Sequence, residues 1–265
     1  MCLLKGSLLG LVFANRKWLG VSLVFLVAFF CVLFLRGYLV VFDFVVSGWV
    51  FALHLDWVTV GAVWVSFAFD TYSLLGVSLV VAGYFFYKNH LFEGVLLLVA
   101  MGGVAALVGG FKVLVHSARP LDGLIVDLGY SFPSGHTAGS LVFCGLLAYF
   151  AWHRWKSPRV RVLLSALVVG VVCVVGFDRL YLNVHWFSDV LGGCLLGLFW
   201  LTFVILLAKL LGVNKGWLPQ KFPKKGFFVC VWGWWLVACF LLFSAVFVSV
   251  FVDGLSFSSI DVSLY

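Results

Sequence analysis

The sequence has very few charged residues. Of its 265 residues, 10% are charged and 65% are hydrophobic, and the mean hydropathy is +1.20. A soluble domain of ordinary composition has about 25% charged residues and roughly half apolar residues. The shortage of charge therefore excludes an ordinary soluble protein, because much of this chain must be in contact with lipid.

Paired cysteines and acidic residues are also scarce. The seven cysteines form no Cys-X-X-Cys pair, and all except Cys2 lie in apolar runs. This pattern supports neither a disulfide framework nor a zinc site. Only 10 residues are acidic, against 17 Lys and Arg, so the net charge is +7. Such a charge can indicate a nucleic-acid partner, and its distribution along the chain decides whether it does.

What the sequence does contain is a series of long apolar runs. A helix that crosses a membrane needs about 20 mostly apolar residues. Runs of this kind predict spans at 18–35, 70–87, 91–113, 136–153, 160–177, 189–211 and 227–252. The region 37–69 is interrupted by Asp43, His54 and Asp56, and we expect helices there that lie in the membrane interface and fold partly against the bundle. The predicted fold is all-α, a polytopic membrane helix bundle with a six-span core and a seventh, C-terminal span.

The positive charge follows the predicted topology. With the N-terminus in the cytoplasm, 13 of the 17 Lys and Arg fall on the cytoplasmic side. They are Lys5, Arg16, Lys17, Lys88, Arg154, Lys156, Arg159, Arg161, Lys209, Lys215, Lys221, Lys224 and Lys225. Cytoplasmic loops of membrane proteins carry such an excess, so no nucleic-acid partner is expected.

This orientation divides the chain into five parts. We expect a cytoplasmic lead-in (1–17), a transmembrane domain (18–211), a basic cytoplasmic loop (212–226), an extra span (227–252) and an extracytoplasmic tail (253–265). The protein is predicted to be a multi-pass protein of the cell membrane. The sequence makes no prediction of its oligomeric state.

Four cations remain on the outer side. Arg36 directly follows the first span and is expected to snorkel to the interface as an end residue. Lys112, Arg119 and Arg179 come from separate places along the chain, yet all fall at one membrane face. Lys112 and Arg119 are seven residues apart, nearly two helical turns, so both can point the same way. The outer end of the bundle is therefore predicted to bind an anion.

The stretch Pro133-Ser134-Gly135-His136 opens the predicted span 136–153. Proline suits the first turn of a helix, serine can cap it, and glycine lets a ligand approach the backbone. A helix N-terminus also presents unpaired N–H groups to an anion. Together with the outer cations, this segment favours a multiply charged oxyanion, most simply phosphate.

The stretch GFDRLYLNVHWFSDVLGG (176–193) adds a titratable pair. His185 and Asp189 are spaced i and i+4, so we expect them on one face of a helix. A carboxylate that holds one imidazole N–H makes the other ring nitrogen more nucleophilic, and His136 is then free to act as general acid. The set predicts phosphoryl transfer without a metal or cofactor, because the cations stabilise the developing charge. Independent interfacial anchors are the alternative, but intramembrane ionisable residues are functional by default.

These three motifs resemble the type 2 phosphatidic acid phosphatase (PAP2) family, the membrane branch of a group shared with vanadium haloperoxidases. The resemblance rests on Lys112 with six residues before Arg119-Pro120, the segment Pro133–His136, and Arg179 with five residues before His185 and three more before Asp189. It implies a six-helix bundle with its site at the outer end.

The resemblance also implies a role for each residue. His185 would attack phosphorus and form a phosphohistidine that water hydrolyses, with Asp189 supporting His185 and His136 protonating the leaving group. The residues expected to hold the phosphate oxygens are Lys112, Arg119, Ser134, Gly135 and Arg179.

The chain departs from the family pattern at Asp178, where the third motif usually begins with serine. An ionised carboxylate would repel phosphate, so we expect Asp178 to point aside or to pair with a nearby cation. The span 227–252 is a second departure, because it adds a seventh helix to the usual six.

The position of the site favours a phosphate carried on a lipid. The loop 121–132 has 12 residues, too few for a large lid, so an open site reached from the outer leaflet is expected. Undecaprenyl pyrophosphate, phosphatidylglycerophosphate, phosphatidic acid and lipid A phosphates all fit, and the motifs recognise only their phosphate.

Other classes of function remain open at this point. A lipid phosphotransferase would use the same site. A transporter would place its ionisable residues at mid-membrane. A non-catalytic scaffold would be expected to lack one of His136, His185 and Asp189.

Overall fold

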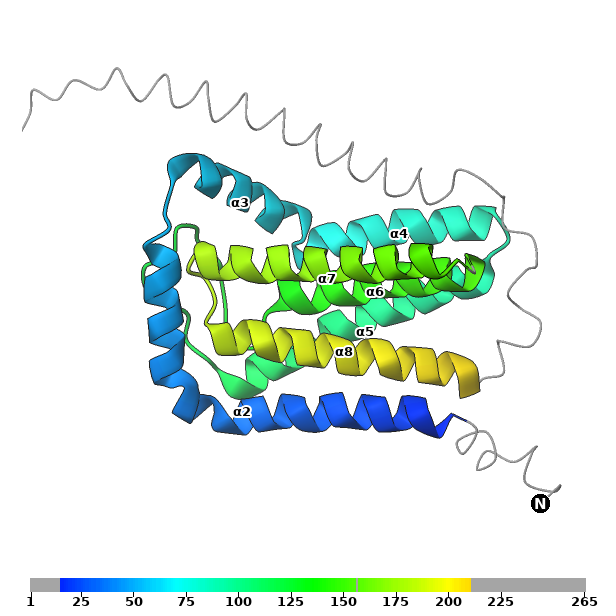
Figure 1. Ribbon diagram of the computed structural model, residues 1–265, viewed down its shortest axis with the longest axis horizontal. Coiled ribbons are helices and arrows are strands. Elements are labelled where there is room, and N and C mark those ends of the chain that lie inside the picture. The colour runs from blue at the N-terminus through cyan, green and yellow to red at the C-terminus, as the bar shows by residue number, and fades with distance from the viewer. Residues whose placement is uncertain (1–14, 156, 211–265) are drawn as a thin grey trace, which may run out of the picture. The chain divides into compact units, whose positions relative to one another are not determined.

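The structure is a computed structural model that describes residues 15–155 and 157–210. Within these residues every regular element is an α-helix, which confirms the predicted all-α class (Figure 1). In chain order the helices are α2 (Arg16–Phe51), α3 (Asp56–Ala68), α4 (Thr71–Tyr87), α5 (Leu91–Val115), α6 (Gly135–Arg154), α7 (Pro158–Tyr181) and α8 (Phe187–Leu210). The predicted seventh span 227–252, the loop 212–226, the tail 253–265 and most of the lead-in 1–17 lie outside the described residues.

The helices have the length and composition of membrane spans. By these criteria α2, α5, α7 and α8 can each cross a membrane, and α3 with α4 forms a fifth candidate that is bent by 51°. α6 does not meet the hydropathy criterion for a span, because its first turns contain His136, Thr137 and Ser140, which lower its mean hydropathy. It is nevertheless the central helix, since it packs against α4, α5, α7 and α8. The chain is a multi-pass membrane protein. The polar first turns of α6 are enclosed by the other helices.

α2 is longer than the sequence predicts. Residues 37–51, expected to form an interfacial helix of their own, are instead the second half of α2. Figure 1 shows that this half turns and runs across one end of the bundle. There Asp43 accepts hydrogen bonds from the backbone N and the Oγ of Ser188, at 2.8 and 2.7 Å. The acidic residue that interrupts the apolar run thus caps the start of α8.

α8 and α6 approach each other closely at the same end of the bundle. A methyl group added at Gly193 would lie 2.5 Å from the carbonyl oxygen of Ser134, so this contact requires glycine. The backbone N of Ser134 also donates to the carbonyl oxygen of Asp189 at 3.0 Å. The starts of α6 and α8 are therefore fixed relative to one another by main-chain contacts.

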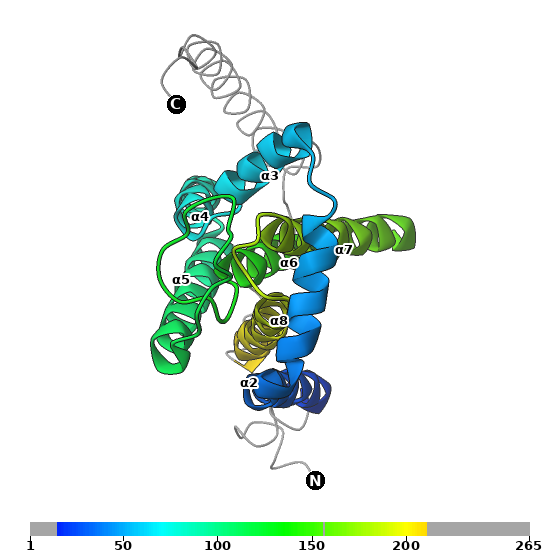
Figure 2. The same ribbon diagram turned by 90° about the vertical axis from the view of Figure 1, so that its left-hand side faces the viewer.

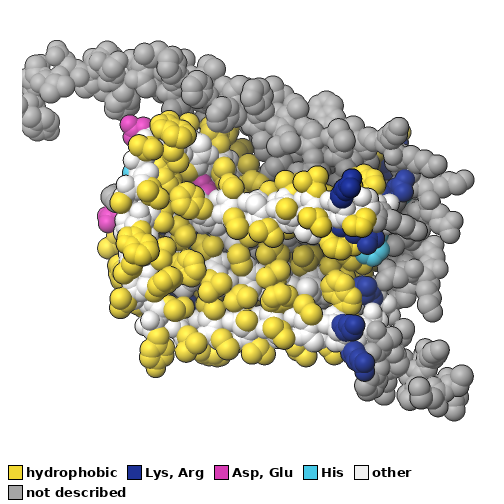
Figure 3. Space-filling view, in the orientation of Figure 1, with side chains coloured by type: hydrophobic (Ala, Val, Ile, Leu, Met, Phe, Trp, Pro, Cys, Tyr) yellow, Lys and Arg dark blue, Asp and Glu magenta, His cyan; other side chains and the backbone are white. Residues whose placement is uncertain are grey.

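The two ends of the bundle differ in charge. Lys and Arg side chains gather at the end where α2 begins and α8 ends, whereas acidic side chains lie at the opposite end (Figure 3). We call the first the basic end; its described cations are Arg16, Lys17, Lys88, Arg154, Arg159, Arg161 and Lys209. Figure 2 looks onto the other end, which the second half of α2 and the connection between α5 and α6 cross.

Candidate active site

The three predicted motif segments meet at the end opposite the basic end. α5 and α7 finish there, with Lys112 and Arg179 in their last turns, and α6 and α8 begin there, with His136 and Asp189 in their first turns. Consecutive antiparallel helices share an end in this way, and the connection 116–134 brings Arg119 to the same place. The structure thus assembles the constellation that the span count predicts.

His185 lies in the short connection between α7 and α8, not on a helix as expected. The reason is that the Asp189 side chain accepts a hydrogen bond from the backbone N of Trp186 at 2.8 Å, so α8 begins only after His185. The imidazole is buried between two partners. Its Nδ1 is 3.5 Å from Oδ2 of Asp189, and its Nε2 is 3.2 Å from Nη1 of Arg119.

The surroundings of His185 favour its neutral form. Burial lowers the pKa of its imidazole to about 4, with Arg119 and Lys112 lowering it further and the nearby carboxylate of Asp189 acting in the opposite direction. Near neutral pH the ring is therefore uncharged, and one of its two ring nitrogens retains a lone pair.

Asp189 is held from several parts of the chain. It accepts a hydrogen bond from Ser131 Oγ, and its Oδ1 is 3.1 Å from Nη2 of Arg36. The prediction that Arg36 snorkels is wrong, because only 18% of its side chain is exposed and its guanidinium lies over the Phe132 ring, 4.3 Å from the centroid. Arg36 faces inward because α2 continues past it and turns over the site.

His136 lies in the first turn of α6 and faces two opposite charges. Its Nε2 is 3.3 Å from Nη1 of Arg179 and 3.8 Å from Oδ1 of Asp70. Asp70 also caps α4 by accepting a hydrogen bond from the backbone N of Tyr72 at 2.9 Å. His136 is therefore positioned beside both a guanidinium group and a carboxylate.

Arg179 is fully buried, and its guanidinium group makes contacts on two sides. It donates to Oδ2 of Asp178 through Nε at 2.9 Å and also through Nη2. The expectation that Asp178 pairs with a nearby cation is confirmed. Because Asp178 occupies one side of the guanidinium, the Nη1 that faces His136 is the part of Arg179 directed toward the site.

Arg119 organises the connection between α5 and α6. Its Nη1 donates to the carbonyl oxygen of Val184 at 2.7 Å and its Nε to that of Gly129 at 3.1 Å. The same Nη1 is 3.1 Å from Oδ2 of Asp127. One guanidinium therefore joins this connection to the residues just before His185.

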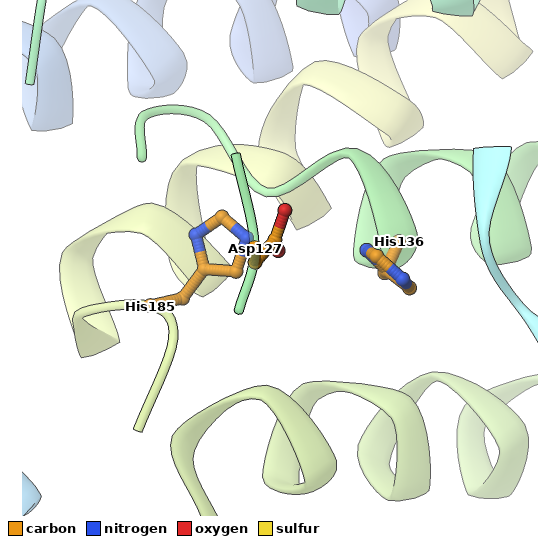
Figure 4. Close-up of side chains that lie close together, drawn as sticks. All are labelled: Asp127, His136 and His185. Atoms are coloured by element: carbon orange, nitrogen blue, oxygen red, sulfur yellow. The ribbon is translucent and has the colours of Figure 1, made fainter. Parts of the chain in front are cut away.

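Asp127 lies between the two histidines (Figure 4). One ligand atom from each of Asp127, His136 and His185 lies within 4.8 Å of the other two. By residue type this set could hold a metal ion, but Arg119 contacts both Asp127 and His185 and would repel a cation. The space between the imidazoles consequently suits an anion, and the Asp127 carboxylate provides one.

The remaining predicted residues surround this space. Lys112 is close enough to Arg119 and Asp127 to interact with both electrostatically. Ser134 is buried and caps α6, as expected, by accepting a hydrogen bond from the backbone N of Thr137 at 3.5 Å. A methyl group added at Gly135 would lie 3.3 Å from atoms of α4 and α5, so this glycine also serves helix packing.

Residues 93–212 match the family model described as the PAP2 superfamily. This segment contains every residue that the sequence predicts for the site. Over these residues the chain is similar to the PAP2 superfamily. The resemblance expected from the three motifs is confirmed, and the cluster around His136 and His185 is the part of the chain that carries the PAP2 motifs.

Two relatives are similar to parts of the chain. Phosphatidylglycerophosphatase B of Bacillus subtilis (strain 168) is 34% identical over 119 residues, which are 44% of this chain and 58% of the relative. A protein of Escherichia coli (strain K12) named as an undecaprenyl-diphosphatase is 40% identical over 89 residues, which are 34% of this chain and 35% of that protein. The chain thus spans less than two thirds of the length of both relatives.

A solved structure has the same fold. The crystal structure of a transmembrane PAP2 type phosphatidylglycerolphosphate phosphatase from Bacillus subtilis superposes with a TM-score of 0.66 at 22% identity. The match covers 76% of this chain and 99% of that chain. The fold shared with that structure therefore extends beyond the segment matched by the family model.

Four residues around the PAP2 motifs were missed in the sequence: Arg36, Asp70, Asp127 and Ser131. Asp70 precedes an apolar run and has the position of an ordinary helix cap. Asp127 and Ser131 lie in a connection where polar residues are expected anyway. Arg36 follows a long apolar run, where a cation is ordinarily interpreted as the end of a span.

Proposed function

We propose that the chain is an integral membrane phosphatase that removes phosphate from a lipid phosphate or lipid pyrophosphate through a phosphohistidine. The observation that carries this proposal is the environment of His185. Its Nδ1 lies against Asp189 while its Nε2 faces Arg119 and the space shared with His136. A neutral, oriented imidazole beside several cations is suited to attack phosphorus.

In the first step, Nε2 of His185 forms a bond to phosphorus as the bond between phosphorus and the lipid oxygen breaks. The electron pair of that bond stays with the leaving oxygen, which takes a proton from His136. The carboxylate of Asp70 lies 3.8 Å from the same Nε2 of His136. Asp189 stabilises the positive charge that develops on His185.

In the second step, water attacks the phosphohistidine. His136 takes the proton of the water, the bond between nitrogen and phosphorus breaks, and His185 is regenerated with release of inorganic phosphate. The groups proposed to hold the phosphate oxygens throughout are Lys112, Arg119, Arg179 and the first turn of α6 at Ser134 and Gly135. No metal ion or cofactor takes part in these steps.

Asp127 has to leave its present position when phosphate binds. Its carboxylate lies between the two imidazoles and is paired with Arg119 at 3.1 Å. A phosphate group in that space would replace it as the anion beside Arg119. We propose that Arg119 exchanges Asp127 for substrate during each turnover.

The substrate class is proposed to be lipid phosphates of the outer leaflet. The names of the two relatives refer to a phosphatidylglycerophosphate and an undecaprenyl diphosphate, one phosphomonoester and one pyrophosphate. The connection beside the site also exposes Leu121, Val126 and Leu128, each with more than four fifths of its surface accessible. Apolar side chains at this place are compatible with a substrate that remains in the bilayer.

We further propose that residues 18–211 form the phosphatase domain and that the site faces the extracytoplasmic side. The support is the gathering of Lys and Arg at the opposite end of the bundle, which the positive-inside rule assigns to the cytoplasm.

The test is phosphate release by the purified protein in detergent, with EDTA present, from a panel of lipid phosphates and lipid pyrophosphates. His185→Asn should lose about three orders of magnitude in turnover. His116→Asn is the matched control, because it removes an exposed histidine at the same end of the bundle, and it should retain activity. Vanadate should compete with substrate.

Three outcomes would contradict the proposal. Near-normal turnover by His185→Asn would rule out His185 as the nucleophile. Loss of activity in EDTA that magnesium restores would rule out the metal-free mechanism. Transfer of phosphate to an added lipid alcohol, without release into water, would identify a phosphotransferase instead.

A further inference from the structure

A cavity of about 870 Å³ opens at the basic end of the bundle, away from the candidate active site. Its walls come from the first turns of α2 and α7 and the last turns of α6 and α8. Along α7 the lining runs from Arg161 to Val169, a length of about 12 Å. The space exists because α7 diverges from its neighbours here: the buried residues of α7 begin only at Val175.

Two cations stand at the mouth of this cavity beside aromatic rings. The guanidinium of Arg161 lies 5.4 Å from the ring centroid of Trp152, and Nζ of Lys209 lies 4.8 Å from that of Trp18. His153 lines the same mouth. We call this cavity, with Arg161, Lys209 and His153 at its mouth, the basic cleft.

The basic cleft has no anionic partner in the described part of the chain. None of the ion pairs between described residues includes Arg161 or Lys209. Glu93, the acidic residue on the basic half of the bundle, is completely buried beside His90. Among the described residues the cleft thus concentrates positive charge without neutralising it, which favours an anionic ligand.

The lining changes from charged to apolar with depth. Beside the cations lie the aromatic side chains of Trp18, Tyr149 and Trp152, and farther along α6 and α7 the lining residues are Gly145, Ala148, Ser165, Val168 and Val169. Membrane proteins place cations and aromatic rings at the depth of lipid headgroups and apolar residues at the depth of acyl chains. The same order along the cleft matches one phospholipid molecule.

We propose that the basic cleft binds an anionic phospholipid, with the lipid phosphate between Arg161 and Lys209 and an acyl chain along α7. Basic pockets between transmembrane helices are a known kind of site for anionic headgroups. The bound lipid would fill the gap that α7 leaves and hold the first half of this helix against α6 and α8. The site is separate from the catalytic one and lies in the opposite leaflet.

The experiment measures lipid retained by the full-length protein in detergent, by native mass spectrometry. Phosphatidylglycerol is compared with zwitterionic phosphatidylcholine, and vanadate is present so that the candidate active site is occupied. The wild type should bind one phosphatidylglycerol in preference to phosphatidylcholine. Arg161→Gln and Lys209→Gln should each weaken this binding about fivefold, and the double variant about 25-fold.

Lys88→Gln is the matched control, because it removes a cation from the basic end outside the cleft and should keep the wild-type preference. Ala148→Trp is a second variant that retains every cation but fills the apolar part of the cleft, and it should expel the lipid. Equal binding of the two lipids by the wild type would overturn the proposal. An equal loss in Lys88→Gln, or undiminished binding by Ala148→Trp, would do so too.

Discussion

At the scale of single residues, the ionisation of His185 has a direct consequence for pH dependence. Burial holds the pKa of its imidazole at about 4, below the ordinary value of about 6.5. In the proposed mechanism the neutral form attacks phosphorus, and this form persists until the pH falls through the lowered pKa. We therefore expect kcat/KM to fall with decreasing pH only below pH 5. The measurement uses two substrates whose phosphate groups titrate differently, so that titration of the enzyme is separated from titration of the substrate.

The variant Arg119→Gln tests the direction of this pKa shift independently. Arg119 is one of the cations that lower the pKa of His185, so Arg119→Gln should move the acid limb to higher pH as well as weakening substrate binding. An inflection close to pH 6.5 in the wild type would show that the titrating base is not this buried imidazole.

Asp127 supports a second prediction at this scale. Asp127→Asn keeps the shape of the side chain but removes the charge that is proposed to compete with phosphate for Arg119. Inorganic phosphate and vanadate should then inhibit at concentrations about fivefold lower, because a unit charge a few ångströms away contributes about 1 kcal/mol or more. Asp122→Asn, an exposed change of the same kind in the same connection, is the control. Unchanged or weaker inhibition of Asp127→Asn would refute the exchange.

The residues of the site differ in how far the sequence predicts them. Lys112, His136 and His185 could be placed together because each lies at the end of a long apolar run, and counting the runs fixes which ends meet. Arg36 could not be placed, because a cation after an apolar run looks the same whether the helix stops or continues. Asp127 could not be placed either, because no local sequence pattern predicts where a connection folds back toward the site.

At the scale of helices, the second half of α2 acts on α8. Asp43 accepts two hydrogen bonds from Ser188, in the same helical turn as Asp189. Asp43→Ala should destabilise the protein by about 1–2 kcal/mol through loss of this cap, and should lower kcat because Asp189 shifts. Asp43→Asn keeps an acceptor and should restore most of both.

Thermal unfolding in detergent and single-turnover phosphate release measure the two effects of Asp43→Ala. Equal stability of Asp43→Ala and wild type would mean that the capping contact is dispensable.

The sequence predicted the starts and ends of α4 to α8 to within a few residues, because apolar length limits a span. It did not predict that residues 37–51 continue α2, because Asp43 interrupts the apolar run there.

At the scale of the whole molecule, the separation of charge between the two ends predicts sidedness. A cysteine introduced at Asp122, next to the site, should react with a membrane-impermeant thiol reagent on intact cells. A cysteine at Arg159, on the basic end, should react only after the cells are opened. The reverse pattern would place the site in the cytoplasm and would remove the proposed outer-leaflet substrates.

The ion pair between Arg36 and Asp189 joins residues 153 positions apart. A ribosome must therefore make nearly all of the described chain before the arginine of the first helix meets its carboxylate. Until α8 is inserted, α2 carries a cation in the membrane without its counter-ion. A chain interrupted before α8 keeps that unneutralised charge, so the site is complete only after the start of α8 has been made.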